Sequence, residues 1–543
     1  MSALANVPQE VLEHIAYFAA TDTFLGPPDG LIPLLSVDRR THGALSISSN
    51  PYLWSRIFAS KFDLTPPTRR LRSLGRTLST LDICEELKLR CSLLKVIRRR
   101  TDARATSYAL SPTHRDGLRS VLWTAYLMML ENEGRNERQL REYAGFDVWL
   151  KEFLFHASGA SLAVWSVKAD LWPPNNERAA LALWLFWYML KPEEYTRSDS
   201  STFLEATNIL KLYALGAHQY ALSTPPWNEF TPPCRTRGAS AIKHFGVSLK
   251  MSPPAPASPA ILAYLTLAHK LSATYDTMRY HKPPSTTPPG LAAAPSSVEW
   301  DAEWARGLHI ADTSKPLGAL FSGAFIPGSL EGVWEGMFTY TEFTAYSALL
   351  SGAAPTVLQR SAIAHHPHLW RLREHHLYAP APDDGVDDDG GGATVVSPGP
   401  EVWPVAPGNP LRAHIPHECQ MAETSDGLLI REQGLAESVL YHSWASVQKA
   451  KEQDRPRGRL VDIFVTGEGH SAWGQFNLVG RIRPCDGFIS LSKEYVDGDR
   501  GQWLYRGYMV GNAEGSLSGR WRDTLSPPEM PGYEGCFVMS RRK

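Results

Sequence analysis

The sequence has few of the residues that stabilise extracellular or zinc-bound domains. Its 543 residues include six cysteines, and no two of them form a Cys-x-x-Cys pair. Such scattered cysteines argue against a disulfide framework and a zinc ribbon, and they favour a reducing compartment. We therefore expect a cytoplasmic or nuclear protein.

The sequence also has no long hydrophobic run and almost no net charge. The most apolar run, Ala179–Leu190, is much shorter than the roughly 20 residues of a membrane-spanning helix, so it predicts a buried helix. No basic leader precedes an apolar core at the N-terminus, so no signal peptide is expected. Lys and Arg number 55 against 56 Asp and Glu, for a net charge of -1. With no bias toward polyanions, we expect neither a membrane nor a nucleic-acid partner.

Sequence signatures of common enzymes are absent as well. The chain has no P-loop, no Gly-x-Gly-x-x-Gly loop after a strand and no His-Glu-x-x-His. The stretch Gly467-Glu468-Gly469-His470-Ser471 predicts a turn and not a nucleophile elbow, because Gly-x-Ser-x-Gly is absent there. We therefore expect no catalytic residues and no enzymatic activity.

Two His-containing stretches could in principle bind a metal. The first is His365-His366-Pro367-His368 with His375-His376, and the second is His414-x-x-His417-Glu418-Cys419. Zinc ligands are usually fixed by helix or hairpin spacing, whereas both stretches lie in sequence that predicts loops. We expect no metal and no cofactor, with an enzyme that has a metal site in the His-rich segment left open as an alternative.

Three short amphipathic segments occupy the first sixty residues. Pro8 suits the first turn of a helix, where a backbone N–H would have no partner. Three such helices in about fifty residues bury little surface by themselves. Apolar side chains should therefore be left over to dock on another subunit. The residues expected to form or support that interface are Val7, Pro8, Val11, Leu12, Ile15, Leu34, Leu35, Leu53 and Trp54.

Helical patterns continue through the middle of the chain. Apolar segments mostly free of internal glycine and proline recur between Pro-rich joints. They lie at 121–130, 145–155, 179–190, 203–213 and 261–275. No fixed repeat period is visible, so the pattern predicts an irregular α-helical domain and not a solenoid. We expect this domain to act as a rigid spacer.

Strand patterns begin at Gly332-x-Trp334-x-Gly336-x-Phe338, where the two glycines would let a twisted strand bend or another chain approach. They are dense after residue 428, with turn residues between them. The candidates are 428–432, 459–466, 473–483, 487–495, 502–510, 516–522 and 535–540. About eight strands can close a small barrel. Closure requires the first strand to pair with 535–540 around the acidic segment 380–400, a flexible insertion by composition.

The N-terminal pattern resembles the F-box, the module that joins a substrate receptor to a Skp–cullin ubiquitin ligase. The matching residues are Val7-Pro8, Glu10-Val11-Leu12, Ile15, Leu35-Ser36-Val37, Arg39-Arg40, Asn50-Pro51 and Leu53-Trp54. Val-Pro stands where the family usually has Leu-Pro, and residues 23–30 lengthen the link between the first two helices. The resemblance implies a Skp-family adaptor and a cullin scaffold as partners.

The C-terminal strands resemble the receptor barrel of F-box proteins, in particular the animal one that recruits D-type cyclins and a large fungal set. The shared elements are 332–338, 474–482, Lys493-Glu494-Tyr495, 503–507 and Gly519-Arg520-Trp521. The resemblance implies that the barrel captures a protein substrate, often by a chain terminus, for ubiquitin transfer. We thus expect an α+β protein with an F-box-like module at 1–60, a helical domain at 61–315 and an antiparallel barrel at 316–543.

Arginines and aromatic residues gather on neighbouring C-terminal strands. A guanidinium offers a planar fork for a carboxylate or an amide-rich chain end, and aromatic walls would exclude water from that bond. The candidate substrate-binding residues are Trp503, Tyr505, Arg506, Arg520, Trp521 and Arg522. The alternation of side chains does not decide which face of each strand points inward. In the alternative arrangement the arginines lie on the outer surface and the tryptophans belong to the core. A lipocalin- or avidin-like barrel for a small ligand, without a ligase role, is the alternative function.

Overall fold

The structure is a computed structural model. It describes residues 7–100, 102–104, 112–197, 200–223, 230, 239–270, 297–311, 323–379, 405–433, 438–453, 458–498, 500–512 and 514–542. The acidic segment 380–400, expected to be flexible, lies outside these residues. The chain divides into two compact units built from alternating stretches. The first comprises Met1–Ile209, Ser240–Lys250 and Lys282–Trp300, and the second Leu210–Ala239, Met251–His281 and Asp301–Lys543.

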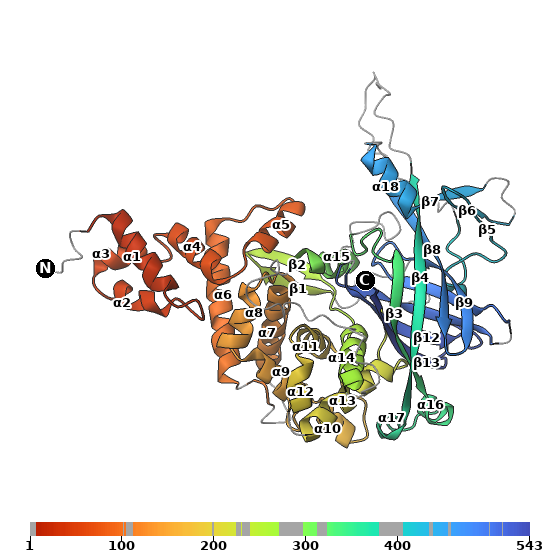
Figure 1. Ribbon diagram of the computed structural model, residues 1–543. Helices are drawn as coiled ribbons and strands as arrows, with labels where there is room; N and C mark the ends of the chain where they lie inside the picture. Colours follow the sequence, from red (N-terminus) through yellow and green to blue (C-terminus); the bar gives the residue numbers. More distant parts are fainter. Residues whose placement is uncertain are drawn as a thin grey trace. The chain divides into compact units, whose positions relative to one another are not determined.

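The first unit begins with four short helices and a 3-10 turn, where the sequence predicts three helices (Figure 1). They are α1 (Gln9–Thr21), the 3-10 turn η2 (Asp29–Leu31), α2 (Ile32–Leu35), α3 (Arg39–Leu45) and α4 (Pro51–Lys61). Side chains cap two of them, because the first N–H groups of a helix have no partner within it. Asp38 accepts a hydrogen bond from the Thr41 amide at 2.7 Å, and Asn50 accepts one from the Leu53 amide at 3.0 Å.

Helices make up most of the remaining first unit. They are α5 (Thr65–Ser73), α6 (Thr80–Arg99), α7 (Pro112–Leu130), α8 (Arg135–Arg138), the π-helical turn η3 (Gln139–Tyr143), α9 (Phe146–Phe155), α10 (Ala163–Lys168), α11 (Glu177–Tyr188), α12 (Pro192–Arg197), α13 (Ser200–Leu215), which continues into the second unit, and the 3-10 turn η5 (Ser297–Trp300). The apolar run 179–190 is largely α11 and is buried throughout its length. No helix in the described part of the chain is both long enough and apolar enough to cross a bilayer.

A two-stranded sheet interrupts this helical region and was not predicted. It consists of β1 (Ser240–His244) and β2 (Val247–Met251), joined by Phe245 and Gly246. Both joining residues have positive φ, 45° and 74°, which is the backbone form of a tight hairpin turn. A phenylalanine is rare at such a position, so the usual Asn-Gly or Asp-Gly signal is missing from the sequence.

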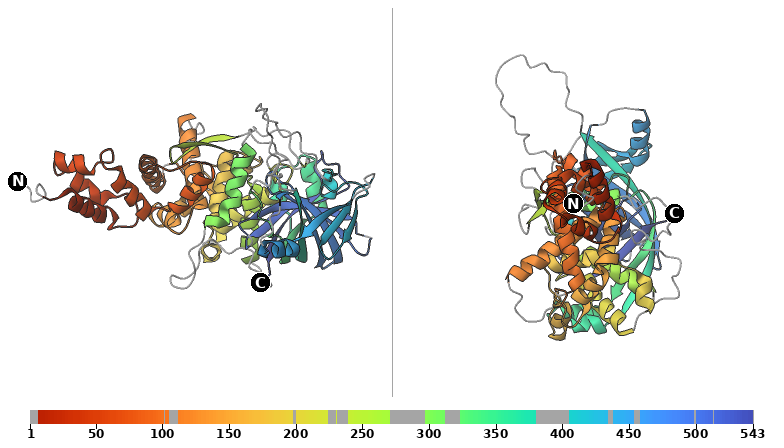
Figure 2. Two further views of the ribbon diagram at one scale, coloured as in Figure 1. Left: turned by 90° about the horizontal axis from the view of Figure 1, so that it is seen from above. Right: turned by 90° about the vertical axis from the view of Figure 1, so that its left-hand side faces the viewer.

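The second unit contains a closed antiparallel barrel, which confirms the predicted α+β fold. Its strands are β3 (Gly332–Thr341), β4 (Ile363–Ala379), β8 (Arg459–Ser471), β9 (Gly474–Ile482), β10 (Ile489–Tyr495), β11 (Gln502–Val510), β12 (Ser516–Asp523) and β13 (Glu534–Arg541). The order is β3-β13-β12-β11-β10-β9-β8-β4, and β3 pairs with β4 to close the ring. The predicted pairing of the first and last strands is present, with Phe338 opposite Phe537. These strands run side by side in blue and green in Figure 2.

Strand β4 corrects the prediction that the first His-rich stretch is a loop. It spans Ile363–Ala379 and pairs with β3 and β8. Side chains alternate between the two sides of the barrel wall, as they must in a strand. The buried positions are His368, Trp370 and Leu372, and the exposed ones are Pro367, Leu369 and Arg371. A histidine, His368, occupies an inward position where an apolar residue is expected. The sequence therefore does not show the alternation of apolar and polar residues that predicts a strand.

Three further strands extend the sheet from β4 beyond the ring. They are β7 (Val439–Ser443), β6 (Gly427–Arg431) and β5 (Gln420–Glu423), in that order from β4. The predicted strand 428–432 is therefore β6 and does not belong to the barrel. The helical elements of this unit are α14 (Ala257–Lys270), α15 (Asp301–Ala311), α16 (Phe343–Leu350), α17 (Thr356–Arg360), η6 (Pro410–Arg412) and α18 (Trp444–Glu452). Of these, α14 packs against β11, β12 and β13.

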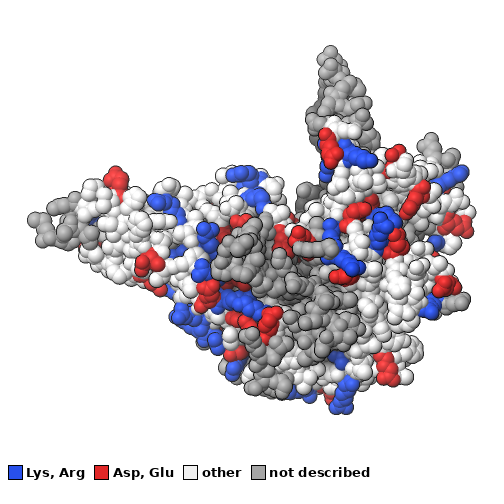
Figure 3. All heavy atoms as spheres, in the orientation of Figure 1, with Lys and Arg blue, Asp and Glu red and all other residues white. Residues whose placement is uncertain are grey.

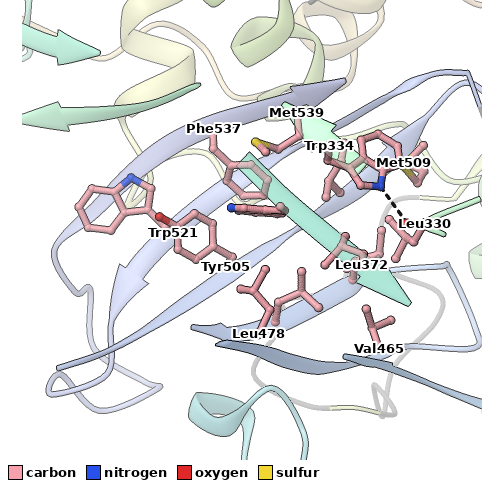
Figure 4. Packing of buried hydrophobic residues seen from close by; sticks show 14 of the residues in the cluster. Leu330, Trp334, Leu372, Val465, Leu478, Tyr505, Met509, Trp521, Phe537 and Met539 are labelled. Carbon is pink, nitrogen blue, oxygen red and sulfur yellow. Dashed lines mark hydrogen bonds between the residues drawn. The ribbon is translucent and has the colours of Figure 1, made fainter. Parts of the chain in front are cut away.

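Large apolar side chains face the barrel interior. The ones labelled in Figure 4 are Leu330, Trp334, Leu372, Val465, Leu478, Tyr505, Met509, Trp521, Phe537 and Met539. The segment before β3 contributes Phe325 and Leu330 to this core, and the Trp334 indole donates a hydrogen bond to the Leu330 carbonyl at 2.8 Å. A side chain at Gly336 would meet the Val538 carbonyl oxygen at 2.0 Å, so this glycine permits the close strand approach predicted for it.

Candidate functional site

Helix α1 has an apolar stripe that the described chain leaves uncovered. Val11, Ile15 and Phe18 are 48%, 39% and 65% exposed. Their spacing of four and three residues places them on one side of the helix. The other stripe of the helix, Leu12, Ala16 and Ala20, is buried. The helix therefore has two apolar faces, of which one is occupied by its own helical cluster.

The other predicted adaptor-binding residues differ in their exposure: some lie at the surface, and others are buried beneath it. Leu12 and Leu53 are buried. Val7, Leu34, Leu35 and Trp54 are half-buried, and Pro8 is exposed. Sequence reasoning missed exposed apolar residues next to this set, namely Phe18, Ile32, Val37 and Tyr52. The seven-residue spacing from Val11 could have identified Phe18.

The structure separates the six predicted substrate-binding residues into two groups on opposite sides of the barrel wall. In the β11–β12 register, Tyr505 lies opposite Trp521 and Arg506 lies opposite Arg520. Tyr505 and Trp521 belong to the interior core, and Trp503 packs against it. Because side chains alternate along a strand, the three arginines face outward. The six residues do not form one pocket.

The three arginines are buried on the outer side, where they bind other parts of the second unit. Arg520 donates to the Tyr213, Ala214 and Tyr220 carbonyls at and just after the end of α13. Arg506 forms an ion pair with Glu534 at 3.1 Å. Burial, with Arg522 and Arg520 nearby, lowers the pKa of Arg506 to about 9. Arg522 donates to the Asp523 carbonyl at the end of β12 and to the Ser526 and Pro527 carbonyls of the β12–β13 loop. These contacts hold the helix and the loop against the barrel.

Aromatic side chains surround the end of the barrel opposite Leu330. We call this ring the aromatic rim, and its members are Tyr340, His366, Trp473, Trp503 and Tyr533. Their rings contact one another or the core beneath. His366 lies 4.7 Å from Trp473, Trp503 lies 5.3 Å from Trp521, and Tyr533 lies 5.4 Å from Trp521.

Exposed apolar residues continue the aromatic rim outward. They lie on the adjoining helix α16, on the β10–β11 turn and on the β12–β13 loop, and they are Phe343, Val496, Leu525 and Met530. Leu525 is 95% exposed. By contrast, acidic and basic side chains are interspersed over the barrel unit on the face shown in Figure 3. Exposed apolar surface rimmed by polar residues is typical of an interaction site. The rim is therefore the best candidate for contact with a ligand or partner.

Lys493 lies inside the barrel beneath the rim and is 2% exposed. Its Nζ atom is 3.0 Å from the Tyr495 hydroxyl, 3.3 Å from His368 Nε2 and 4.0 Å from the centre of the Phe476 ring. Burial lowers the pKa of Lys493 to about 7, because the charged form is poorly solvated there. Sequence reasoning missed it as a site residue. The inward series Ile489, Leu491, Lys493, Tyr495 is the signal that could have found it.

The structure offers no support for a metal centre in the described residues, where no group of His, Cys, Asp and Glu side chains is placed to hold a metal ion. His368 is inward on β4, and His414 lies apart from it among buried residues outside the barrel. Comparison of the chain with protein-family models, curated proteins and solved structures finds no match.

Proposed function

We propose that this chain is the substrate-recognition subunit of a Skp–cullin–F-box ubiquitin ligase. The observation that carries the proposal is the uncovered stripe of α1, Val11, Ile15 and Phe18, within a segment whose residues resemble the F-box. An adaptor subunit that covers this stripe would remove from water apolar surface that the chain itself leaves exposed. The N-terminal helices would bind a Skp-family adaptor, and the adaptor would join the chain to a cullin.

The stripe can be tested with the double variant Val11→Asp, Ile15→Asp. We expect co-purification with a co-expressed Skp-family adaptor to fall at least tenfold, because tenfold is about 1.4 kcal/mol and an unpaired charge in a buried interface costs about that or more. Both side chains are exposed in the free chain, so the thermal midpoint should not change.

The matched control for this experiment is Leu81→Asp. Leu81 is 59% exposed in the first turn of α6, where a negative charge is tolerated, and this variant should retain the adaptor. Normal adaptor recovery with the double variant would refute the proposal.

The barrel would recruit the substrate through the aromatic rim and its exposed apolar neighbours. For the variant Phe343→Ser, Met530→Ser we expect loss of most partner proteins labelled by a proximity-labelling enzyme fused to the chain, while adaptor binding stays unchanged. Leu204→Ser, at an exposed leucine of α13, is the control. An unchanged set of labelled partners would show that substrates bind elsewhere.

A further inference from the structure

Lys493 is a base enclosed by apolar and neutral groups. The strands packed around it contribute His368 from β4, Phe338 from β3, Phe476 from β9 and Tyr505 from β11. On its own strand the neighbour is Tyr495, whose ring lies 5.8 Å from the Arg500 guanidinium on the following turn. No carboxylate forms an ion pair with Lys493 in the described part of the chain.

An amine in this environment differs chemically from a surface lysine. Near neutral pH about half of the Lys493 side chains carry a free lone pair, since the pKa is about 7. For an ordinary lysine the fraction is on the order of one in a thousand. A desolvated lysine of this kind is an activated nucleophile toward carbonyl carbon. The Tyr495 hydroxyl and His368 Nε2, both within hydrogen-bond distance, can relay protons.

Two other polar atoms in the interior lack a partner. His368 Nδ1 and Trp370 Nε1 are buried and make no hydrogen bond within the described residues. Both residues lie on β4, and the centres of their rings are 5.9 Å apart. His368 is also the histidine next to Lys493. A ligand that brings a carbonyl oxygen into this layer would offer one of them an acceptor on entry.

We propose that the barrel binds an apolar aldehyde, which enters past the aromatic rim and forms an imine with Lys493. The amine lone pair attacks the carbonyl carbon, and a C=N bond replaces the C=O bond. The carbonyl oxygen leaves as water with the two protons that the amine gives up, so no oxidant or reductant takes part. Lys493 lies two residues, about 7 Å, from the rim end of β10, within reach of a small ligand. This site goes beyond the proposed ligase role and does not depend on it.

The proposal can be tested by trapping the imine. The full chain is incubated with trans-cinnamaldehyde and sodium cyanoborohydride at pH 7, and the reduced adducts are located by peptide mass mapping. We expect Lys493 to react at least about tenfold faster than any exterior lysine. Its rate should level off above pH 7, whereas the exterior lysines, such as Lys243, should react faster only as the pH approaches 10.

Two variants and a second probe separate the site from general lysine chemistry. Lys493→Met and Lys493→Arg should lose the fast adduct and keep the slow exterior ones, with thermal midpoints recording that each variant is folded. The charged aldehyde glyoxylate should not label Lys493 preferentially, because the rim is apolar. Modification of Lys493 no faster than that of Lys243, or a fast adduct that persists in folded Lys493→Met, would overturn the proposal.

Discussion

Replacing Arg90 by methionine is expected to lower the free energy of unfolding of the first unit by about 4 kcal/mol, because it leaves two buried carboxylates without their cation. Arg90 lies on α6 and is fully buried. It binds Glu86 and Glu131 at 2.9 Å each and Asn136 at 3.2 Å. Methionine would replace the volume of the side chain but none of these bonds.

Arg90 and the two carboxylates connect several elements of the first unit. The guanidinium lies 5.2 Å from the Phe58 ring of α4 and 5.2 Å from the Phe245 ring of the β1–β2 hairpin. On the other side, His244 binds Glu131 at 2.6 Å. Burial alone would raise the pKa of Glu131, but His244 and Arg90 outweigh it and lower that pKa. Ionised Glu131 therefore stabilises the fold at pH values above the usual carboxyl pKa. That stability is lost as the pH falls through the lowered pKa of Glu131.

Urea unfolding followed by tryptophan fluorescence measures the effect of Arg90→Met. In the background Glu86→Gln, Glu131→Gln, where no charge is left behind, Arg90→Met should cost far less. Arg138→Met, which removes the exposed ion pair with Glu142, should change little, because exposed pairs contribute little to stability. A loss below about 1 kcal/mol for Arg90→Met alone would contradict the expected dependence on burial.

Replacing Lys493 by methionine is expected to have the opposite effect and to stabilise the second unit at pH 7. The folded pKa is about 7 against an ordinary value of 10.5. At about 1.4 kcal/mol for each pKa unit, this difference corresponds to at most about 5 kcal/mol. The lost hydrogen bonds and cation–π contacts offset part of it. We expect a net gain of about 2–3 kcal/mol.

The sign of the pH dependence distinguishes this explanation from improved packing. Between pH 7 and pH 10 the unfolded chain binds a proton at Lys493 that the folded chain does not, so the wild-type protein gains stability as the pH rises. The advantage of Lys493→Met should therefore shrink toward pH 10. Lys449→Met, at an exposed position of α18, is the control and should show no such trend. A gain for Lys493→Met that is equal at pH 7 and pH 10 would contradict the expectation.

These two substitutions have opposite expected effects because of what surrounds each cation. Arg90 is buried with two carboxylates, whereas the described residues bring Lys493 only hydroxyl, imidazole and aromatic groups. The charge of Arg90 is needed to balance the cluster, and that of Lys493 opposes folding. Natural chains keep destabilising groups mainly where function uses them, which supports a functional role for Lys493.

The sequence alone determined many of the local elements and the ring closure of this protein. Pro8, Asn50 and Pro51 mark the first helices, and the alternation in 474–482 marks a strand. The pairing of the Trp334 strand with the last strand followed from the need of a closed ring to join its ends, although one of the eight predicted strands, 428–432, lies outside the ring and β4 takes its place. Local backbone preferences and side-chain periodicity suffice for these features because both operate over a few neighbouring residues.

Tertiary structure alone decided which side of each strand faces inward. Alternation places Trp521 and Arg520 on opposite sides of β12, but either side could have been the core. Packing of α14 and of residues 210–220, which include the end of α13, outside the wall assigned the arginines to the exterior and the aromatics to the barrel. The same packing places Lys493 inside the barrel. Pairing with β3 and β8 makes the first His-rich stretch a strand. Burial depends on contacts between residues far apart in the chain, and no local pattern contains that information.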